Sequence, residues 1–208
     1  MKIYPMTLGP VDTNCYILSE GSRAVIVDPA GEPQKILKYL EANKLVVEAI
    51  LLTHGHFDHI GAVNEVMEKF PVPIYAHKRE KEYFDRPEVN LSSHFGEAYT
   101  LKSDYDYRWL DEGHQIEVLG HHVAINHVPG HTPGSLTYYF KDLGVIFTGD
   151  TLFKGSMGRT DLQYGNHDLL HKGIKTKLLV LPVDTVAYSG HGEATTIGDE
   201  LKTNRFFI

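Results

Sequence analysis

The stretch THGHFDH, residues 53–59, follows directly on the apolar run 49–52 and holds three histidines and one aspartate. Neutral imidazole and carboxylate are ligands that zinc, iron and manganese accept in proteins, and no thiolate is required. The spacing predicts a bend between a strand and a helix. In that bend His54 and His56 can converge on one ion, while Asp58 and His59 point across to a second.

Three further apolar runs end in loops of the same kind, with a histidine or an aspartate beside glycine. They lead into HVPGHTPGS with His131, TGD with Asp150 and SGHG with His191. Glycine lets the backbone turn tightly or approach a ligand closely, and binding sites gather on loops held by a rigid sheet. Five histidines and two aspartates are therefore available from four strand ends. That number favours two metal ions with a shared carboxylate over a closed four-ligand structural site.

The order and spacing of these motifs resemble the metallo-β-lactamase superfamily along nearly the whole chain. The resemblance implies an α/β fold, a four-layer αββα sandwich, with two divalent metal ions in its active site. Zinc is the expected metal, with iron or manganese as alternatives. The implied ligands are His54, His56 and His131 for the first ion, Asp58, His59 and His191 for the second, and Asp150 as a bridge.

Within the superfamily, the chain is similar to small bacterial glyoxalase II-like proteins, which are hydroxyacylglutathione hydrolase-like. Two runs carry this similarity, LFKGSMGRTD at residues 152–161 and GHGEATTIGDE at residues 190–200. It implies hydrolysis of a 2-hydroxyacyl thioester of a low-molecular-weight thiol, of the S-lactoylglutathione type. Arg159, in the first run, is a candidate substrate-binding residue.

The ligand set also indicates a mechanism. Two ions can lower the pKa of a bridging water, so that hydroxide forms without a side-chain base and attacks a polarised carbonyl. Asp58 is the expected catalytic side chain, because it can accept a hydrogen bond from that hydroxide and orient it. Free thiols have a pKa of about 8.5, so a thiolate leaves readily and a thioester suits a site without an evident general acid.

The end of the chain bears on the choice of substrate. Only residues 192–208 follow His191, enough for one short helix, so we expect no C-terminal glutathione-binding helical domain. We therefore expect slow hydrolysis of S-lactoylglutathione with a high KM. The run GRTD, residues 158–161, also resembles the persulfide dioxygenase branch, in which His54, His131 and Asp150 would hold a single iron ion. A lactonase and a non-catalytic metal-binding domain are further alternatives.

Periodicity predicts one domain over residues 1–208 with two sheets packed face to face between helices. The first half contains a hairpin of runs 15–18 and 24–27, a helix from Pro33 to about Asn43, and a helix with an apolar stripe from Ile60 to Phe70. In the second half we expect strands near residues 115–118, 121–127, 135–140 and 144–147, followed by a helix that begins near Asn166 and buries Leu170, Ile174 and Leu178.

Composition limits the compartment and the partners. The chain has one cysteine, Cys15, which we expect to be buried. It has neither an apolar stretch long enough to cross a bilayer nor a signal-peptide core at its start, which predicts a cytoplasmic protein without membrane association. The net charge of −7 and the scattered basic residues argue against nucleic-acid binding. The predicted partner is a small-molecule thioester, and the sequence leaves the oligomeric state open.

Residues 84–109 show no clear period and are rich in aromatic side chains. A loop of this length is usually functional or disordered, and the aromatic content argues against disorder. We predict a lid or insert over the mouth of the metal site, in which His94 can touch the substrate. Of the other histidines, His77 is expected at the surface, and no feature of the sequence gives His127 a role.

Overall fold

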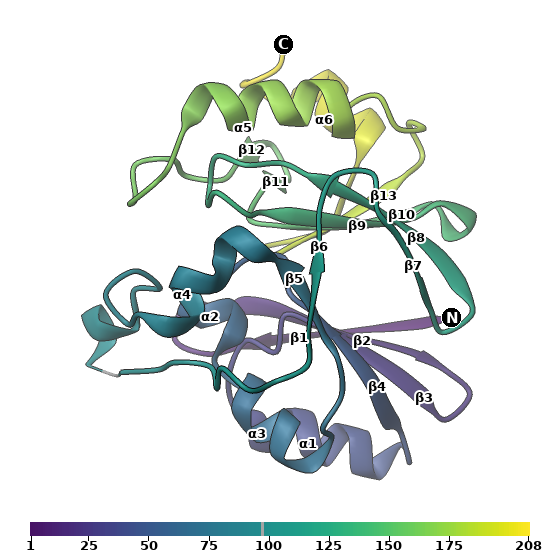
Figure 1. Ribbon diagram of the computed structural model, residues 1–208. Coiled ribbons are helices and arrows are strands. Elements are labelled where there is room, and N and C mark those ends of the chain that lie inside the picture. Colours follow the sequence, from purple (N-terminus) through teal and green to yellow (C-terminus); the bar gives the residue numbers. More distant parts are fainter. Residues whose placement is uncertain (97) are drawn as a thin grey trace.

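The computed structural model describes residues 1–96 and 98–208, in which two six-stranded sheets lie face to face (Figure 1). The first sheet follows the chain order: β1 (Lys2–Leu8), β2 (Thr13–Glu20), β3 (Arg23–Val27), β4 (Val46–Leu51), β5 (Ile74–His77) and β6 (Tyr107–Leu110). The second sheet has the order β14 (Thr195–Thr196), β13 (Val186–Ser189), β10 (Val145–Gly149), β9 (Leu136–Phe140), β8 (His121–His127) and β7 (Gln115–Val118). A separate ribbon pairs β11 (Leu152–Phe153) with β12 (Ser156–Met157).

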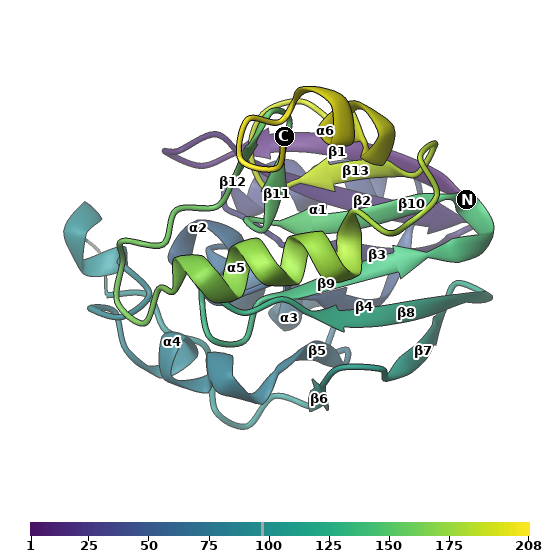
Figure 2. The ribbon, with the colours of Figure 1, turned by 90° about the horizontal axis from the view of Figure 1, so that it is seen from above.

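Helices cover the outer face of each sheet (Figures 1 and 2). The first sheet carries α1 (Pro33–Ala42) and α3 (Val63–Lys69), and the second carries α5 (His167–Gly173) and α6 (Ile197–Thr203). Two short helices, α2 (Phe57–Ile60) and α4 (Lys81–Asp85), lie at one end of the sandwich. The predicted four-layer αββα architecture is thus confirmed. Within the described parts of the chain, no helix combines the length and the apolar character needed to cross a membrane.

Side-chain alternation along the strands builds an apolar layer on each side of each sheet. In β3, Ala24 and Ile26 pack toward α1 and α3, whereas Val25 and Val27 pack toward the second sheet. In β10, Ile146 packs toward α5. Because both faces of these strands are covered, they appear in the sequence as continuous apolar runs and not as a polar–apolar alternation.

Most of the predicted elements are present. The hairpin joins β2 to β3 in antiparallel register, and α1 ends at Asn43 as expected. Asn166 caps α5 by accepting a hydrogen bond from the Leu169 amide at 3.0 Å. The helix continues past Gly173 through a further turn, Ile174–Leu178. The three residues predicted to line its buried face are fully buried, namely Leu170, Ile174 and Leu178. Cys15 is buried too.

The helix predicted from Ile60 to Phe70 is wrong in one respect, because it is broken into α2 and α3. The Ala62 amide bonds the Pro29 carbonyl at 2.8 Å and not a helical carbonyl. A Cβ on Gly61 would lie 2.6 Å from the Ala30 carbonyl oxygen, so only glycine allows this close approach. Because of this break, α2 can point Asp58 and His59 toward the ends of the strands, while α3 packs on the outer face of the first sheet.

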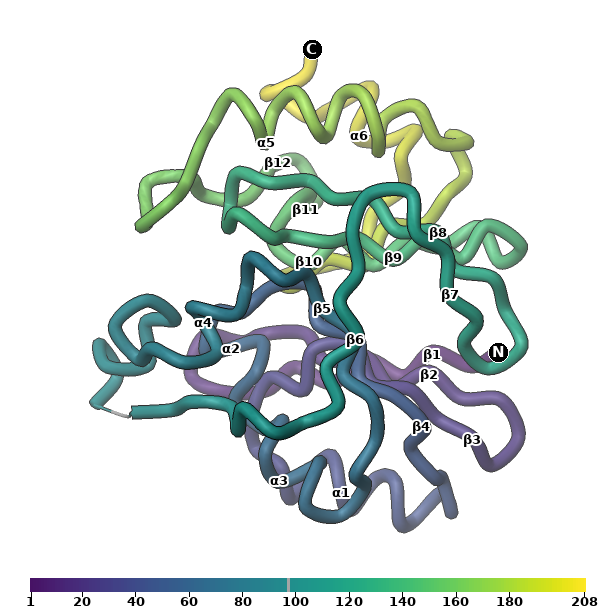
Figure 3. The backbone as a smooth tube through the Cα atoms, viewed as in Figure 1, coloured from purple at the N-terminus to yellow at the C-terminus, as the bar shows by residue number. Residues whose placement is uncertain are grey.

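The segment predicted as a lid, residues 84–109, is more ordered than expected. Its last part is the edge strand β6, which pairs with β5 in parallel, so the expected loop boundary at 109 is wrong. From β6 the backbone crosses to the second sheet and enters β7 (Figure 3). The Phe95 ring lies 4.5 Å from that of Phe57 in α2. Glu97 lies outside the described residues, and a lid role for the segment stays a prediction.

Candidate metal centre

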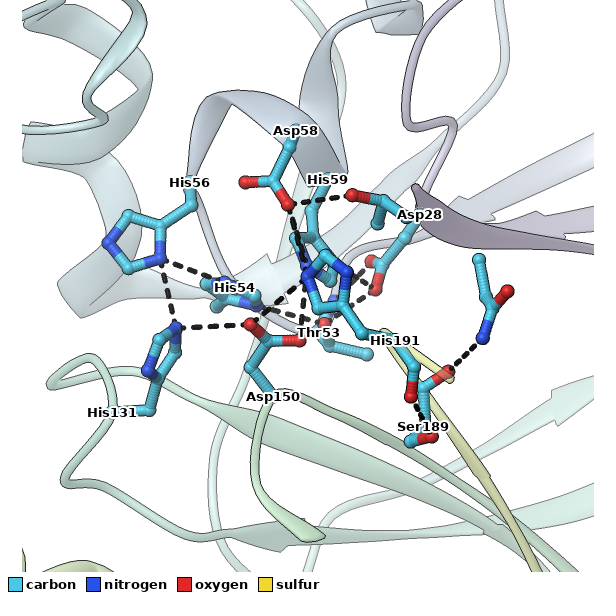
Figure 4. A network of polar contacts seen from close by, with 12 residues as sticks. Asp28, Thr53, His54, His56, Asp58, His59, His131, Asp150, Ser189 and His191 are labelled. Carbon is cyan, nitrogen blue, oxygen red and sulfur yellow. Dashed lines mark hydrogen bonds and ion pairs between the residues drawn. The ribbon is translucent and has the colours of Figure 1, made fainter. Parts of the chain in front are cut away.

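The ends of four strands bring all seven predicted ligand residues together between the two sheets (Figure 4). β10 and β13 are parallel neighbours in the second sheet, so the loops that follow them emerge at the same edge. β4 ends opposite them in the first sheet and leads directly into α2. The residues brought together are His54, His56, Asp58, His59, His131, Asp150 and His191.

His54, His56 and His131 form the first set, and their ring nitrogens converge on one point. Nδ1 of His56 lies 3.0 Å from Nε2 of His54 and 3.0 Å from Nε2 of His131. Nδ1 of His131 donates to the Arg159 carbonyl at 2.9 Å, so in the neutral ring Nε2 is unprotonated and faces the same point. Three buried nitrogens that converge in this way can share one metal ion.

Asp58, His59 and His191 form the second set. Oδ2 of Asp58 lies 3.5 Å from Nε2 of His59 and 3.3 Å from Nε2 of His191. Asp150 lies between the two sets. Its Oδ1 is 3.2 Å from Nε2 of His59, and its Oδ2 is 3.5 Å from Nε2 of His131 and from Nε2 of His191. One carboxylate therefore faces both sets.

Two atoms at the middle of the cluster show that its residues fit a cation. Nε2 of His59 and Oδ1 of Asp150 are buried, and no hydrogen-bond partner is found for them among the described residues. Nδ1 of His59 donates to Asp28 at 2.8 Å, so in the neutral ring Nε2 carries no proton. The lone pair of Nε2 then points at the Asp150 carboxylate. Two buried acceptors face each other favourably only with a proton or a cation between them. Imidazole nitrogen and carboxylate oxygen are also donors that divalent metal ions accept.

The two sets differ in protonation. Burial lowers the pKa of His54 well below its ordinary value, lowers that of His56 to about 3, and also lowers that of His131. Burial lowers the pKa of His59 too, but the neighbouring carboxylates raise it well above its ordinary value. For His191, hydrogen bonds to the two aspartates outweigh burial and raise the pKa to about 10. Without a metal, the first set is neutral and the second holds protons.

Asp28 supports the cluster on the side away from the ligand atoms, and it was not among the predicted site residues. This carboxylate is buried, with φ at 49°, and it accepts hydrogen bonds from the Thr53 amide at 2.8 Å and the Thr53 hydroxyl at 2.6 Å. It also accepts from Nδ1 of His59 at 2.8 Å, which fixes the tautomer of that ring. In the sequence, Asp28 opens the run DPAG between β3 and the helix that begins at Pro33, and a lone aspartate in such a turn is not by itself a sign of a metal centre.

Glu80 joins the two loops that supply the first set, and no sequence motif marks it. Its carboxylate is buried and accepts hydrogen bonds from the Gly55 amide at 2.7 Å, the Thr132 hydroxyl at 2.8 Å and the Gly134 amide at 2.7 Å. Gly55 lies between two ligand histidines, and Thr132 follows the third. Burial raises the pKa of Glu80 to about 7. In the sequence it lies in the charged run KREKEY, which is typical of a solvated surface.

Residues of β2 hold the remaining loops. The Thr13 hydroxyl donates to Oδ2 of Asp58 at 2.7 Å. The Asn14 side chain donates to the carbonyls of Ser189 and Gly192, at 3.1 and 2.9 Å, and so spans the loop that carries His191. Neither residue was predicted to support the centre, and the available signal was the pair of polar side chains directly before the apolar run 15–18.

The two predicted substrate-binding residues lie outside the cluster. His94 is exposed, next to Phe95 on a short turn, Ser92–Phe95. The Arg159 side chain is exposed and forms two 2.8 Å hydrogen bonds to Asp161, while its carbonyl accepts from His131. A substrate contact for either side chain stays a prediction.

Comparison with known proteins agrees with this geometry. The model of the metallo-beta-lactamase superfamily matches residues 8–191. A probable metallo-hydrolase of Bacillus subtilis, YqgX, is 40% identical over 206 residues, which cover 99% of this chain and 97% of that protein. Hydroxyacylglutathione hydrolase GloC of Haemophilus influenzae is 35% identical over 208 residues, with the same coverage of both chains.

Solved structures show the same similarity. The B3 metallo-beta-lactamase BLEG-1 superposes with a TM-score of 0.94 at 41% identity, over 99% of each chain. A di-iron-bound form of TTHA1623 superposes with a TM-score of 0.87 at 37% identity, over 98% of this chain and 99% of the other. This chain thus combines a four-layer αββα sandwich with a histidine–aspartate centre at its strand ends, and the relatives that share its full length include a probable metallo-hydrolase. The chain belongs to the metallo-β-lactamase superfamily, as its motifs predicted.

The difference in protonation predicts how zinc binding depends on pH. Because the pKa of His191 is about 10, this ring carries a proton at neutral pH, and a cation that binds the second set must displace it. The zinc affinity of the second set should therefore rise with pH through the neutral range. The first set, with its lowered pKa values, has no such proton to lose. Calorimetric zinc titrations near pH 6 and near pH 8, in buffers of different ionisation enthalpy, should show proton release with the second equivalent only. Equal proton release with both equivalents would contradict the assignment of protons.

Glu80→Gln tests the connection between the two loops. The glutamine oxygen can still accept hydrogen bonds from Thr132 and Gly134, but the glutamine NH2 group then faces the N–H of Gly55. Two donors repel each other, so the loop that carries His54 and His56 should shift. We expect the zinc affinity of the first set to fall roughly 10- to 100-fold, as is typical when a residue that orients metal ligands is replaced. Competition with a chelator measures this. Glu82→Gln is the control, because Glu82 lies in the adjoining helix α4 and pairs with Arg86 at the surface. An equal loss there would refute the role of Glu80.

Proposed function

We propose that this metallo-hydrolase is a two-metal thioester hydrolase that cleaves a 2-hydroxyacyl thioester of a low-molecular-weight thiol, with zinc as its natural metal. One observation carries the two-metal part. Asp150 turns Oδ1 toward His59 and Oδ2 toward His131, and these histidines belong to different sets. A carboxylate in that position can bridge two ions. The name of the GloC relative, a hydroxyacylglutathione hydrolase, supports the choice of substrate.

Each set would hold one ion. His54, His56 and His131 would hold the first, Asp58, His59 and His191 the second, and Asp150 would contribute to both. When bound, two divalent ions would lower the pKa of a water toward neutrality and polarise the substrate carbonyl. The donors also suit iron, and one similar structure is a di-iron-bound form, so iron is the alternative metal.

Asp58 is placed to orient the attacking water. Burial raises its pKa, but the charge of His59 and the hydrogen bond from His191 lower it to about 2, so the carboxylate stays ionised. Its contacts with Thr13 and His191 both fall on Oδ2. Oδ1 of Asp58 is then left to accept a hydrogen bond from the attacking water. That bond would orient the water so that a lone pair of the water oxygen points at the substrate carbonyl.

The centre opens to solvent beside His191. The His191 side chain is 30% exposed, whereas those of Asp58 and Asp150 are 11% and 12% exposed. A substrate approaching from this side presents its carbonyl to the cluster and leaves its thiol carrier outside. Because a thiolate is a stable anion near neutral pH, departure of the carrier needs no proton donor.

A covalent route through cysteine does not fit this chain. Cys15 is its only cysteine and is fully buried in β2. Burial raises the pKa of its thiol, which opposes formation of the thiolate nucleophile. Attack by water oriented in the cluster is therefore the route that the geometry supports.

The persulfide dioxygenase is the second candidate function. It would use His54, His131 and Asp150 for a single iron ion. In that case His56, whose Nδ1 lies 3.0 Å from both histidines, would have no ligand role, and neither would the second set. The closeness of His56 supports the hydrolase. Oxygen consumption on a persulfide, with one iron per chain, would identify the dioxygenase instead.

Asp150→Ala tests the bridge. Removing the carboxylate that faces both sets should leave fewer than two metals per chain. Thioester hydrolysis should fall by more than roughly 100-fold, because replacing a ligand should cost more than replacing a residue that only orients one. Elemental analysis and steady-state kinetics measure the two effects. His94→Ala is the comparison, because His94 lies on the exposed turn and should change KM or have little effect. Equal damage from both substitutions would mean that His94 belongs to the inner site.

A panel of hydroxyacyl thioesters with different thiol carriers tests the substrate class. The ester of glutathione and esters of other small thiols should be hydrolysed by the zinc-loaded protein, with carrier differences mainly in KM because the carrier is remote from the reacting carbonyl. A β-lactam and an acyl-homoserine lactone serve as controls. Turnover of the lactone or the lactam without any thioester turnover would contradict the proposal.

A further inference from the structure

A second cluster of metal-ligand side chains lies where β5, β6 and β8 end, apart from the centre described above. His77 ends β5 in the first sheet, His127 ends β8 in the second, and Asp111 follows β6. The three side chains offer ligand atoms that all lie within 4.8 Å of one another. The expectation that His77 lies at the surface is wrong, because its side chain is only 5% exposed.

The two imidazoles lie against each other and face the same carboxylate. Their ring centroids are 4.2 Å apart and the planes are inclined by 12°. Oδ1 of Asp111 lies 3.5 Å from Nε2 of His77 and 3.9 Å from Nδ1 of His127. Because Asp111 is 65% exposed, the cluster is open to solvent on one side, beside a cavity of about 400 Å³.

The hydrogen bond on the far side of His127 prepares its inner nitrogen for a cation. Nε2 of His127 donates to the Pro133 carbonyl at 2.8 Å, so in the neutral ring Nδ1 is an unprotonated lone pair. That lone pair faces the Asp111 carboxylate, and two acceptors at this separation repel each other. A backbone carbonyl that fixes the outer N–H is also the usual support of a metal-bound histidine.

His77 needs one rearrangement to take part. Its Nδ1 accepts a hydrogen bond from the Arg79 amide at 3.0 Å, which places the ring proton on Nε2, toward Asp111. Binding of a cation at Nε2 would move that proton to Nδ1 and break the Arg79 contact. The amide lies in a partly buried turn that His77 caps, so binding would cost this one capping hydrogen bond.

We infer that His77, Asp111 and His127 form a third cation site, for a divalent ion of the zinc class with two imidazoles and one carboxylate as ligands. Lys177, which follows α5 and donates from Nζ to the His127 carbonyl at 2.6 Å, is paired with Glu112 at 2.6 Å, which limits its repulsion of the ion. The site joins the two sheets at their open edge. It also fixes the start of the loop that runs from His127 to His131, so the ion stabilises the fold without taking part in hydrolysis.

Calorimetry on the metal-loaded protein tests this inference. Protein saturated with zinc in the main centre and freed of excess ion is titrated with more zinc. The wild type should bind one further equivalent, and its Tm should rise by about 3 °C at a zinc concentration roughly ten times Kd. Asp111→Asn keeps the shape of the side chain and an oxygen for the Glu112 amide, but it removes the anionic ligand. This variant should bind the extra zinc at least tenfold more weakly, with thioester hydrolysis unchanged.

Two further variants separate the site from nonspecific binding. His127→Gln retains an amide that can donate to Pro133 and should also lose the extra equivalent. Asp142→Asn removes the carboxylate of an exposed His–Asp pair at the other end of β8, where His121 lies 2.6 Å away, and should bind like the wild type. No extra equivalent in the wild type, unchanged binding in Asp111→Asn, or equal loss in Asp142→Asn would each overturn the inference.

Discussion

The rest of the structure depends on the balance of charge around His59. This fully buried ring lies between three carboxylates, with Nδ1 2.8 Å from Asp28 and Nε2 3.5 Å from Asp58 and 3.2 Å from Asp150. An ionised carboxylate in a dry interior costs several kcal/mol unless it is paired. Protons on the second set supply the balancing charge when no metal is bound, and cations supply it when the centre is filled. Metal binding and stability are therefore linked in this protein.

The apolar layers make this concentration of polar groups possible. Both sheets are covered on both faces, so the loops at the strand ends start from fixed positions. Residues behind the ligands then fix each loop. Glu80 connects the loops of the first set, and Asn14 holds the loop of His191. At Gly190 a Cβ would lie 2.2 Å from Oδ1 of Asp150, so the backbone itself approaches the cluster there.

The sequence was sufficient to predict the seven clustered residues, because the same signal occurs four times. Each time an apolar run ends in histidine or aspartate beside glycine, and strand ends converge. The supporting residues could not be found in this way. Thr13 bonds Asp58 across 45 positions and Glu80 bonds Thr132 across 52, and no local pattern records such pairs.

The errors in secondary structure have a similar origin. The break at Gly61 depends on the Pro29 carbonyl, which replaces a helical partner for the Ala62 amide. The aromatic residues of β6 looked like part of a loop because their partners in β5 lie 33 positions earlier in the chain, as in the pair Ile74 and Tyr107. His77 is buried by contacts with His127 from the other sheet, which a short strand ending in histidine does not reveal. These features depend on tertiary contacts and not on local propensity.

Anomalous X-ray diffraction at the zinc absorption edge tests the central claim most directly, because it locates each ion without reference to activity. Within the main centre, crystals of the zinc-loaded protein should show two strong peaks about 3.5–4 Å apart, one on each side of the Asp150 carboxylate. One peak should be bounded by His54, His56 and His131, and the other by Asp58, His59 and His191. A single peak on His54, His131 and Asp150, with the second set free of metal at saturating zinc, would contradict the account.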